Sequence, residues 1–154
     1  MAAVEVKGGG KYEAVLQRLV DLKMGVKAGV LKGATTTNGQ SIAAYAAYNE
    51  YGTAHIPPRP FLRTTASDKI SSWQNVLAHA VTGKVEDQQT WTRALTLTGE
   101  AMKANIKETI QRGGFAANAP GTIKAKQRSG KREPDHPLID TGQMLAAISY
   151  EVVR

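Results

Sequence analysis

The sequence predicts an α+β fold, in which a small, mostly antiparallel sheet packs against one long helix and two or three shorter helices. Apolar residues recur at spacings of three and four over several segments, which is typical of amphipathic helices. Strand signals occur at Val4–Lys7, Gly25–Lys32 and Ala147–Val153. With 154 residues, of which 42% are hydrophobic, the chain can bury a proper core, so we expect residues 1–154 to form one domain. Residues 1–10 are expected to be a mobile end or an edge strand.

The first expected elements are a helix, a strand and a turn. The segment Lys11–Lys23 has apolar residues at helical spacing and is followed by a glycine that stops the helix. In Gly25–Lys32, valine and alanine alternate with lysine, which indicates a strand. The segment Gly33–Gln40 is rich in threonine, asparagine and glycine, and is expected to be a turn or loop.

An alanine-rich helix then leads into a proline-rich segment. Ser41 is the expected N-cap of the helix Ile42–Tyr51, and Gly52 suits the left-handed position that ends it. Three prolines fix φ and remove amide donors, so Ile56–Pro60 is expected to be a stiff, extended rod. Such a rod loses little entropy on binding, which favours a recognition segment. A rigid connector that docks on its own core is an equally good interpretation.

The second half of the chain predicts two long helices and a basic loop. Apolar residues at helical spacing predict a helix in Thr64–Gly83 and a longer one in Val85–Gln111. The longer one, with about 25 helical residues, would extend roughly 37 Å and is expected to form the centre of the core. No periodicity survives in 113–137, which is expected to be a flexible loop. Asp140, with Gln143 three positions later, predicts a capping box for a short helical turn before the last strand.

The expected loop holds much of the positive charge of the chain. The formal net charge is +7, from 20 lysines and arginines against 13 acidic residues. Five of the cations lie within nine positions, at Lys124, Lys126, Arg128, Lys131 and Arg132. They could make a salt-sensitive, sequence-independent contact with DNA or with an acidic partner, and a solvated loop is the alternative at about even odds. The loop has no aromatic residue for base stacking, and no recognition helix follows it.

Several classes of protein find no support in the sequence. No run approaches the roughly 20 apolar residues that span a bilayer, and the N-terminus does not have the pattern of a secretory signal. The absence of cysteine excludes disulfides, thiolate metal ligands and a cysteine nucleophile, and is compatible with a reducing cytosol.

The sequence offers no convincing catalytic or metal site. His55, His79 and His136 are far apart and lack metal-ligand spacing, and no phosphate-binding loop or nucleophile motif is present. Glu50 and Glu100 could be paired carboxylates of a hydrolase, but two exposed helix carboxylates are about ten times likelier. We therefore expect that the protein is not an enzyme and that it binds no metal, no cofactor and no small-molecule substrate.

Two segments together resemble a known family. These are "AAYAAYNEYGTAHIPPRPFLR" and the later "TIKAKQRSG…HPLIDTGQMLAAISYEV", and they resemble the head–tail connector and tail-completion proteins of long-tailed bacteriophages and prophages. In that family a Glu-aromatic-Gly-Thr step, here Glu50–Thr53, precedes an Ile-Pro-x-Arg-Pro-Phe segment, here Ile56–Phe61. A Pro-Leu-Ile-Asp-Thr-Gly motif, here Pro137–Gly142, comes before a last strand. The order of elements matches from about Gly25 to Val153.

The resemblance implies a function without catalysis. The family consists of small α+β subunits that assemble as rings at the neck or upper tail of the virion. This chain is then expected to join or seal the head-proximal end of the tail, after assembly in the cytoplasm of a bacterial host. Its partners would be copies of itself, in a ring for which a hexamer is one expected form, and other neck or tail proteins. The basic loop is also expected to contact DNA non-specifically. No contact with a membrane is expected.

The resemblance also implies a structural role for the residues of its motifs. Arg59 and Arg63 are the expected outward-facing contacts, whereas Phe61 and Leu62 are expected to tie the rod to the core of the subunit. The full expected assembly interface comprises Glu50, Tyr51, Gly52, Ile56, Pro57, Pro58, Arg59, Pro60, Phe61 and Arg63.

The rival hypothesis is a small basic nucleic-acid-binding protein that uses 113–137. Steep loss of DNA affinity with salt, together with a monomer in solution, would favour this rival. A hydrolase that uses Glu50 and Glu100 is the third and weakest class, and replacing both with glutamine would test it.

Overall fold

The structure is a computed structural model, and it describes residues 9–81 and 87–154. The described part contains six helices and a two-stranded antiparallel sheet, which confirms the predicted α+β class. The expected strand at Val4–Lys7 lies outside the described residues. The elements in chain order are α1 (Gly9–Leu22), β1 (Gly25–Val30), α2 (Ile42–Tyr51), α3 (Phe61–Ala80), α4 (Gln88–Arg112), α5 (Pro120–Arg128), α6 (Gln143–Ala147) and β2 (Ile148–Val153).

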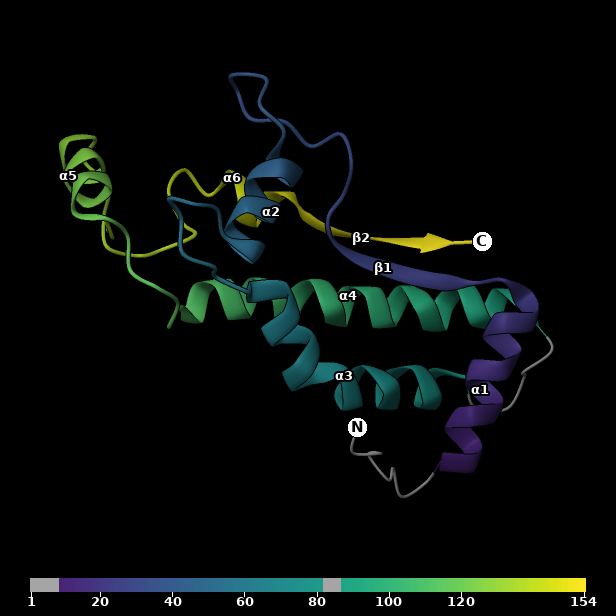
Figure 1. The fold of residues 1–154 in the computed structure, drawn as a ribbon. Coiled ribbons are helices and arrows are strands. Elements are labelled where there is room, and N and C mark those ends of the chain that lie inside the picture. Colours follow the sequence, from purple (N-terminus) through teal and green to yellow (C-terminus); the bar gives the residue numbers. More distant parts are fainter. Residues whose placement is uncertain (1–8, 82–86) are drawn as a thin grey trace.

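The long helix α4 is the centre of the fold. The sheet runs along one side of α4, α3 runs along the other side, and α1 crosses near its N-terminal end (Figure 1). Strands β1 and β2 pair from Gly25 opposite Val153 to Val30 opposite Ile148. Helices α2 and α6 lie at the opposite end of the sheet from α1, and α5 projects beyond the C-terminal end of α4 (Figure 1).

The core has two apolar clusters that α4 connects. The first joins α1, α3 and the start of α4 around Trp91 and Leu95, which are 0% and 1% exposed. The second joins α2, the start of α3, the end of α4 and the chain after α5; Phe61 and Ile110 lie at its centre, both 0% exposed. The expectation that Phe61 anchors the proline-rich segment to the core is confirmed, and Leu62 packs partly buried against the same cluster.

Three expectations from the sequence are wrong in detail. The expected loop 113–137 contains α5, which begins with Pro120 at its first turn. No apolar stripe marks α5, because its one buried side chain is a lysine that binds distant carbonyls. Helix α3 begins at Phe61, three residues before Thr64. Asp140 is not the N-cap of α6, since the chain turns at Gly142, with φ 75°, and the helix starts only at Gln143.

Strand β2 packs closely against α4 at a glycine. A Cβ atom added at Gly99 would overlap the ring of Tyr150, including the ring atom nearest the backbone. The contact cannot be relieved by moving the end of a flexible side chain, since the ring itself is in the way. The sheet therefore approaches α4 only because residue 99 has no side chain.

Gly99→Ala should lower the free energy of unfolding by about 1–3 kcal/mol, because overpacking forces Tyr150 and β2 away from α4. Gly121→Ala is the matched control, because Gly121 is also helical but has nothing within 4 Å of an added Cβ. It should be neutral or slightly stabilising through helix propensity. Urea denaturation measures both variants, and a Gly99→Ala variant as stable as wild type would contradict the close packing.

Candidate functional site

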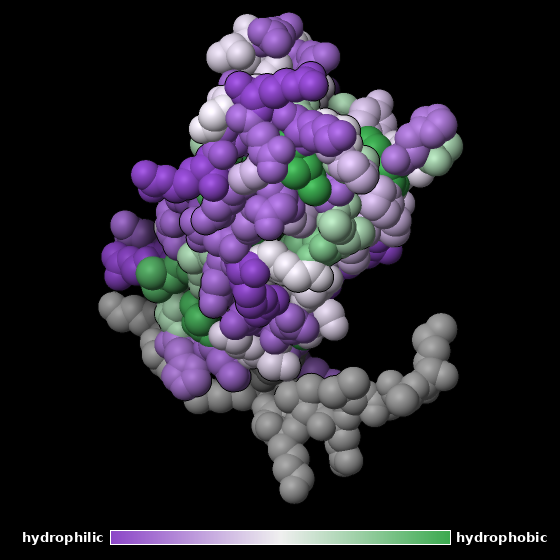
Figure 2. Space-filling model, turned by 90° about the vertical axis from the view of Figure 1, so that its left-hand side faces the viewer, coloured by the Kyte–Doolittle hydropathy of each residue, from purple (hydrophilic) through white to green (hydrophobic). Residues whose placement is uncertain are grey.

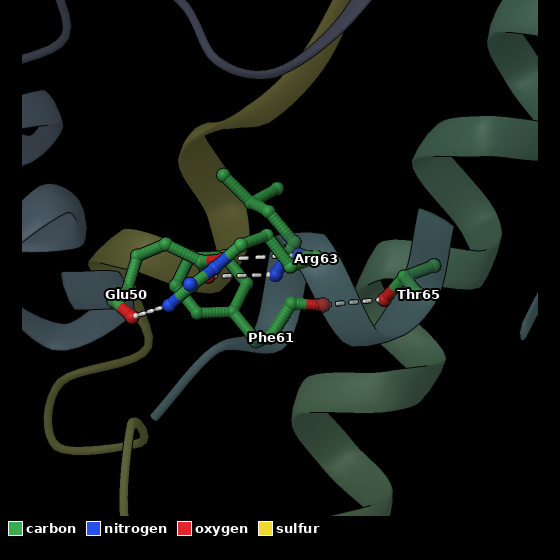
Figure 3. Close-up of polar contacts among 5 residues, drawn as sticks. Glu50, Phe61, Arg63 and Thr65 are labelled. Carbon is green, nitrogen blue, oxygen red and sulfur yellow. Dashed lines mark hydrogen bonds and ion pairs between the residues drawn. The ribbon is translucent and has the colours of Figure 1, made fainter. Parts of the chain in front are cut away.

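The junction between α2 and α3 is built around one buried carboxylate. The side chain of Glu50, on α2, is 3% exposed. Its Oε2 accepts a hydrogen bond from the backbone N–H of Leu62 at 2.8 Å, and its Oε1 accepts one from the N–H of Arg63 at 3.0 Å (Figure 3). Pro60, the N-cap of α3, makes no side-chain capping bond. Glu50 therefore caps α3 from a neighbouring helix, where its negative charge also suits the helix dipole.

Arg63 covers this carboxylate from the solvent side. Its Nε donates to Glu50 Oε1 at 3.0 Å, and its Nη2 donates to the backbone oxygen of Glu50 at 2.8 Å. The guanidinium lies 5.0 Å from the centre of the Tyr51 ring, within the range of a cation–π contact. The side chain of Arg63 is nevertheless 58% exposed, so one face remains available to a partner.

Arg59 does not point outward, and the sequence-based expectation for it is wrong. It is 7% exposed, and its backbone N–H donates to the carbonyl of Asn49 at 2.6 Å. Its guanidinium donates to the carbonyls of Ala116 and Ala117, at 2.7 and 3.0 Å, and to the side-chain oxygens of Asn49 and Asn118, at 3.0 and 3.4 Å. Burial lowers the pKa of this guanidinium. Arg59 thus fastens the chain after α4 to the end of α2.

The chain between α2 and the prolines is a tight turn. Gly52 has a positive φ, as expected, but its φ of 77° and ψ of 173° lie outside the left-handed helical region. The Oγ1 of Thr53 accepts hydrogen bonds from the amides of His55 and Ile56, and the amide of Thr53 donates to the Ile56 carbonyl at 2.9 Å. This turn brings the following prolines back against Gly52, with the nitrogen of Pro58 near the place of a Cβ atom.

The expected interface residues therefore divide into two groups. Glu50, Arg59 and Phe61 are buried and hold the fold together. The exposed ones are Tyr51, Pro57, Pro58 and Arg63, whereas Gly52, Ile56 and Pro60 are half-buried. The buried group cannot contact a partner unless the junction opens.

A surface that the sequence assigned only in part, at Tyr51, continues from this exposed group along α2. The outer side of α2 carries Tyr45, Tyr48 and Tyr51, which are 45%, 54% and 69% exposed. Helix α2 has no charged residue apart from the buried Glu50. We call these three side chains the tyrosine face. The spacing of three positions between the tyrosines is the sequence signal that could have revealed their common exposure.

The basic segment is also divided by the structure. Lys126 is 8% exposed, and its Nζ donates to the carbonyls of His136 and Ile139 at 3.0 and 2.7 Å. Lys131 is half-buried, whereas Lys124, Arg128 and Arg132 are exposed. The surface on the side of α5 is largely hydrophilic, with a few small apolar areas (Figure 2). Three of the five cations are thus freely presented to solvent.

The candidate catalytic residues do not form a common site in the part of the chain that the structure describes. Glu50 is enclosed at the start of α3, whereas Glu100 lies on the outer side of α4 and pairs with Lys103 at 3.2 Å. The hydrogen bond from Lys103 lowers the pKa of Glu100. His136 contacts the carbonyls of Pro137 and Gln111. Within residues 9–81 and 87–154, no three histidine, aspartate or glutamate side chains are grouped so that they could hold a metal ion.

Comparison with known proteins adds no relative. No protein-family model matches the chain, and neither the curated proteins nor the solved structures yield a match. The resemblance to tail-completion proteins therefore rests on the motifs quoted above. None of the described helices has the length and apolar character needed to cross a bilayer.

Proposed function

We propose that this chain is a non-enzymatic virion-assembly protein, a tail-completion or head–tail joining subunit of a phage or prophage. It acts by forming a ring at the neck or at the head-proximal end of the tail. The observation that carries this proposal is the tyrosine face, a rigid and uncharged surface on α2 directly beside the motif that resembles the family.

The tyrosine face has the character of an interface rather than of an ordinary solvated helix. Tyrosine is enriched at the centres of protein interfaces, and charged residues are depleted there. Tyrosine also supplies a large contact area for a small loss of side-chain entropy. The buried cap at Glu50 and the core anchor at Phe61 fix α2 relative to α3, so the surface is pre-formed before a partner arrives.

The partners in this proposal are other copies of the chain and other neck or tail proteins. The exposed cations of α5 supply a separate surface that can approach DNA or an acidic partner without catalysis. The protein then works in the host cytoplasm during assembly and afterwards in the virion.

A phage that carries the Tyr48→Ser and Tyr51→Ser substitutions should yield few infectious particles. Each lost aromatic anchor at the centre of an interface costs about 2 kcal/mol or more, which is roughly thirtyfold in affinity. Electron microscopy should then show full heads separate from tails. Leu97→Ser is the matched control, because Leu97 is 50% exposed but lies on α4. Normal particle yield from the tyrosine variant, with the purified variant folded, would contradict the proposal.

The rival function is salt-sensitive binding to nucleic acid through α5. The specific observation in its favour is the exposure of Lys124, Arg128 and Arg132 on a projecting segment (Figure 1). Neutralising three phosphates gives a slope of about −2.7 for log affinity against log salt. The variant that replaces these three with glutamine tests it and leaves the buried Lys126 in place. If this variant loses DNA affinity, and particle yield falls only when these three cations are replaced, the rival function is favoured.

A further inference from the structure

A cleft of about 510 Å³ lies between the proline-rich segment and α5. This is within the range of small-molecule sites, about 300–1,000 Å³. Arg59, Lys126 and Lys131 line it, and Asp140 is the one acidic lining residue, so three positive charges against one negative leave an excess of two. We call it the cationic cleft. Of the tyrosine face, Tyr45 lines this cleft, whereas Tyr48 and Tyr51 do not. The function proposed above does not depend on the cleft.

Two of its cations are buried without a carboxylate partner. Arg59 and Lys126 are 7% and 8% exposed, and all the hydrogen bonds of their side chains within the described residues go to carbonyl or amide oxygens. Burial lowers the pKa of Lys126, and repulsion from Arg59 and Lys131 lowers it further. The negative charge of Asp140 offsets only part of this shift. Buried charges in proteins are normally balanced by a counter-charge. In this cleft the balance is incomplete.

The unused donors point to a particular anion. Within the described residues, the hydrogen bonds of the Arg59 guanidinium use four of its five N–H groups, and those of the Lys126 ammonium use two of three. Arg59 therefore has no free pair of N–H groups for a bidentate contact with a carboxylate. It can give one donor, as can Lys126, while the ammonium of Lys131 has no acceptor among the described residues. Single donors from separate side chains suit a phosphate, whose oxygens face several directions.

The remaining walls supply hydroxyl and apolar surface. Thr122 lies in the first turn of α5, whose N-cap, Ala119, provides no side-chain cap, so the amides at this helix end are not satisfied by a side chain. The ring of Tyr45 and the side chains of Ile56 and Leu138 line the same cleft. An organic group attached to the phosphate could pack on these residues.

We propose that the cationic cleft binds the phosphate group of a phosphate ester, with Arg59, Lys126 and Lys131 as its charged ligands and the apolar wall against the organic part. The site forms within one subunit, so binding requires neither ring assembly nor DNA. It is a binding site and includes no bond-making step.

The test uses the purified full chain, with inorganic phosphate and adenosine monophosphate as probes and sodium chloride at equal ionic strength as the reference. At ten times the dissociation constant, the monophosphate should raise the thermal midpoint by about 3–6 °C. Lys131→Gln should weaken binding about tenfold or more. Lys124→Gln removes the same charge from exposed α5 outside the cleft, and should leave the affinity within about twofold.

Each outcome decides a part of the proposal. No rise beyond that of sodium chloride, or an equal loss in the Lys131 and Lys124 variants, would overturn the site, because the effect would then be general screening. Equal affinity for phosphate and adenosine monophosphate would overturn the role of the apolar wall. Both variants make conservative changes to side chains without structural hydrogen bonds in the described residues, so they should fold, and circular dichroism checks this.

Discussion

Replacing Glu50 with alanine should lower the free energy of unfolding by about 3–5 kcal/mol, as measured by urea denaturation. The carboxylate is 3% exposed and accepts hydrogen bonds from the amides of Leu62 and Arg63, the second and third residues of α3. Each hydrogen bond to a charged group contributes about 1.5–3 kcal/mol, and both amides would be left without an acceptor. The ion pair with Arg63 adds little to this figure, since the arginine side chain is 58% exposed.

Two further variants separate the cap from general effects of charge. Glu50→Gln keeps one acceptor oxygen and removes the charge, so its free energy of unfolding should lie between those of wild type and Glu50→Ala. Glu13→Ala removes an exposed carboxylate from α1 and should change stability by no more than about 0.5 kcal/mol. A loss below about 1 kcal/mol for Glu50→Ala would mean that the amides of α3 find other partners and that Glu50 is not the cap.

Local signals predicted the parts of the fold that depend on neighbouring residues. The helix Ile42–Tyr51 was predicted with its true bounds, and its N-cap is confirmed, because Ser41 Oγ accepts from the amide of Ala44 at 3.2 Å. The two described strands and the long helix were each predicted to within a few residues. Capping and periodicity act over three or four positions, so a single sequence contains all the information they need.

Two of the wrong expectations concern residues whose partners are distant in the sequence. Arg59 binds oxygens 57 to 59 positions later, and the sequence could show only that a charged side chain follows two prolines. Lys126 belongs to a run of cations, yet it is buried by carbonyls 10 and 13 positions away. In each case a tertiary contact outweighs the ordinary preference of a charged side chain for water.

The division into buried and exposed residues bears on whether the proline-rich segment binds a partner or connects two elements. Its interior side joins them, because Arg59 and Phe61 bind the body of the subunit. Its other side presents Pro57 and Pro58 to solvent, next to the turn that begins at Gly52. The rigid-connector interpretation thus holds for Arg59 and Phe61, whereas recognition of a partner by the exposed prolines stays a prediction. A rigid connection is also what a pre-formed binding surface requires.

Gly52→Ala should have the second large effect, a loss of about 3–5 kcal/mol in the free energy of unfolding. The first cause is backbone strain, because φ of 77° with ψ of 173° is a conformation that side-chain-bearing residues rarely adopt, at a cost of about 1–3 kcal/mol. The second cause is a clash, because an added Cβ would lie 2.9 Å from the oxygen of Ile56 and 3.0 Å from the nitrogen of Pro58. These are backbone atoms held by the turn, so the segment must shift as a unit.

Gly39→Ala is the comparison variant for a positive φ without a clash. Gly39 has nearly the same φ, 78°, but nothing lies within 4 Å of an added Cβ. It should therefore lose only about 1–2 kcal/mol, by strain alone. The difference between the two variants, measured by urea denaturation under the same conditions, combines the strain of ψ 173° at Gly52 with the clash against Ile56 and Pro58. Equal losses would mean that the proline-rich segment moves away at little cost, and the pre-formed surface that the proposed function requires would then lose its physical basis.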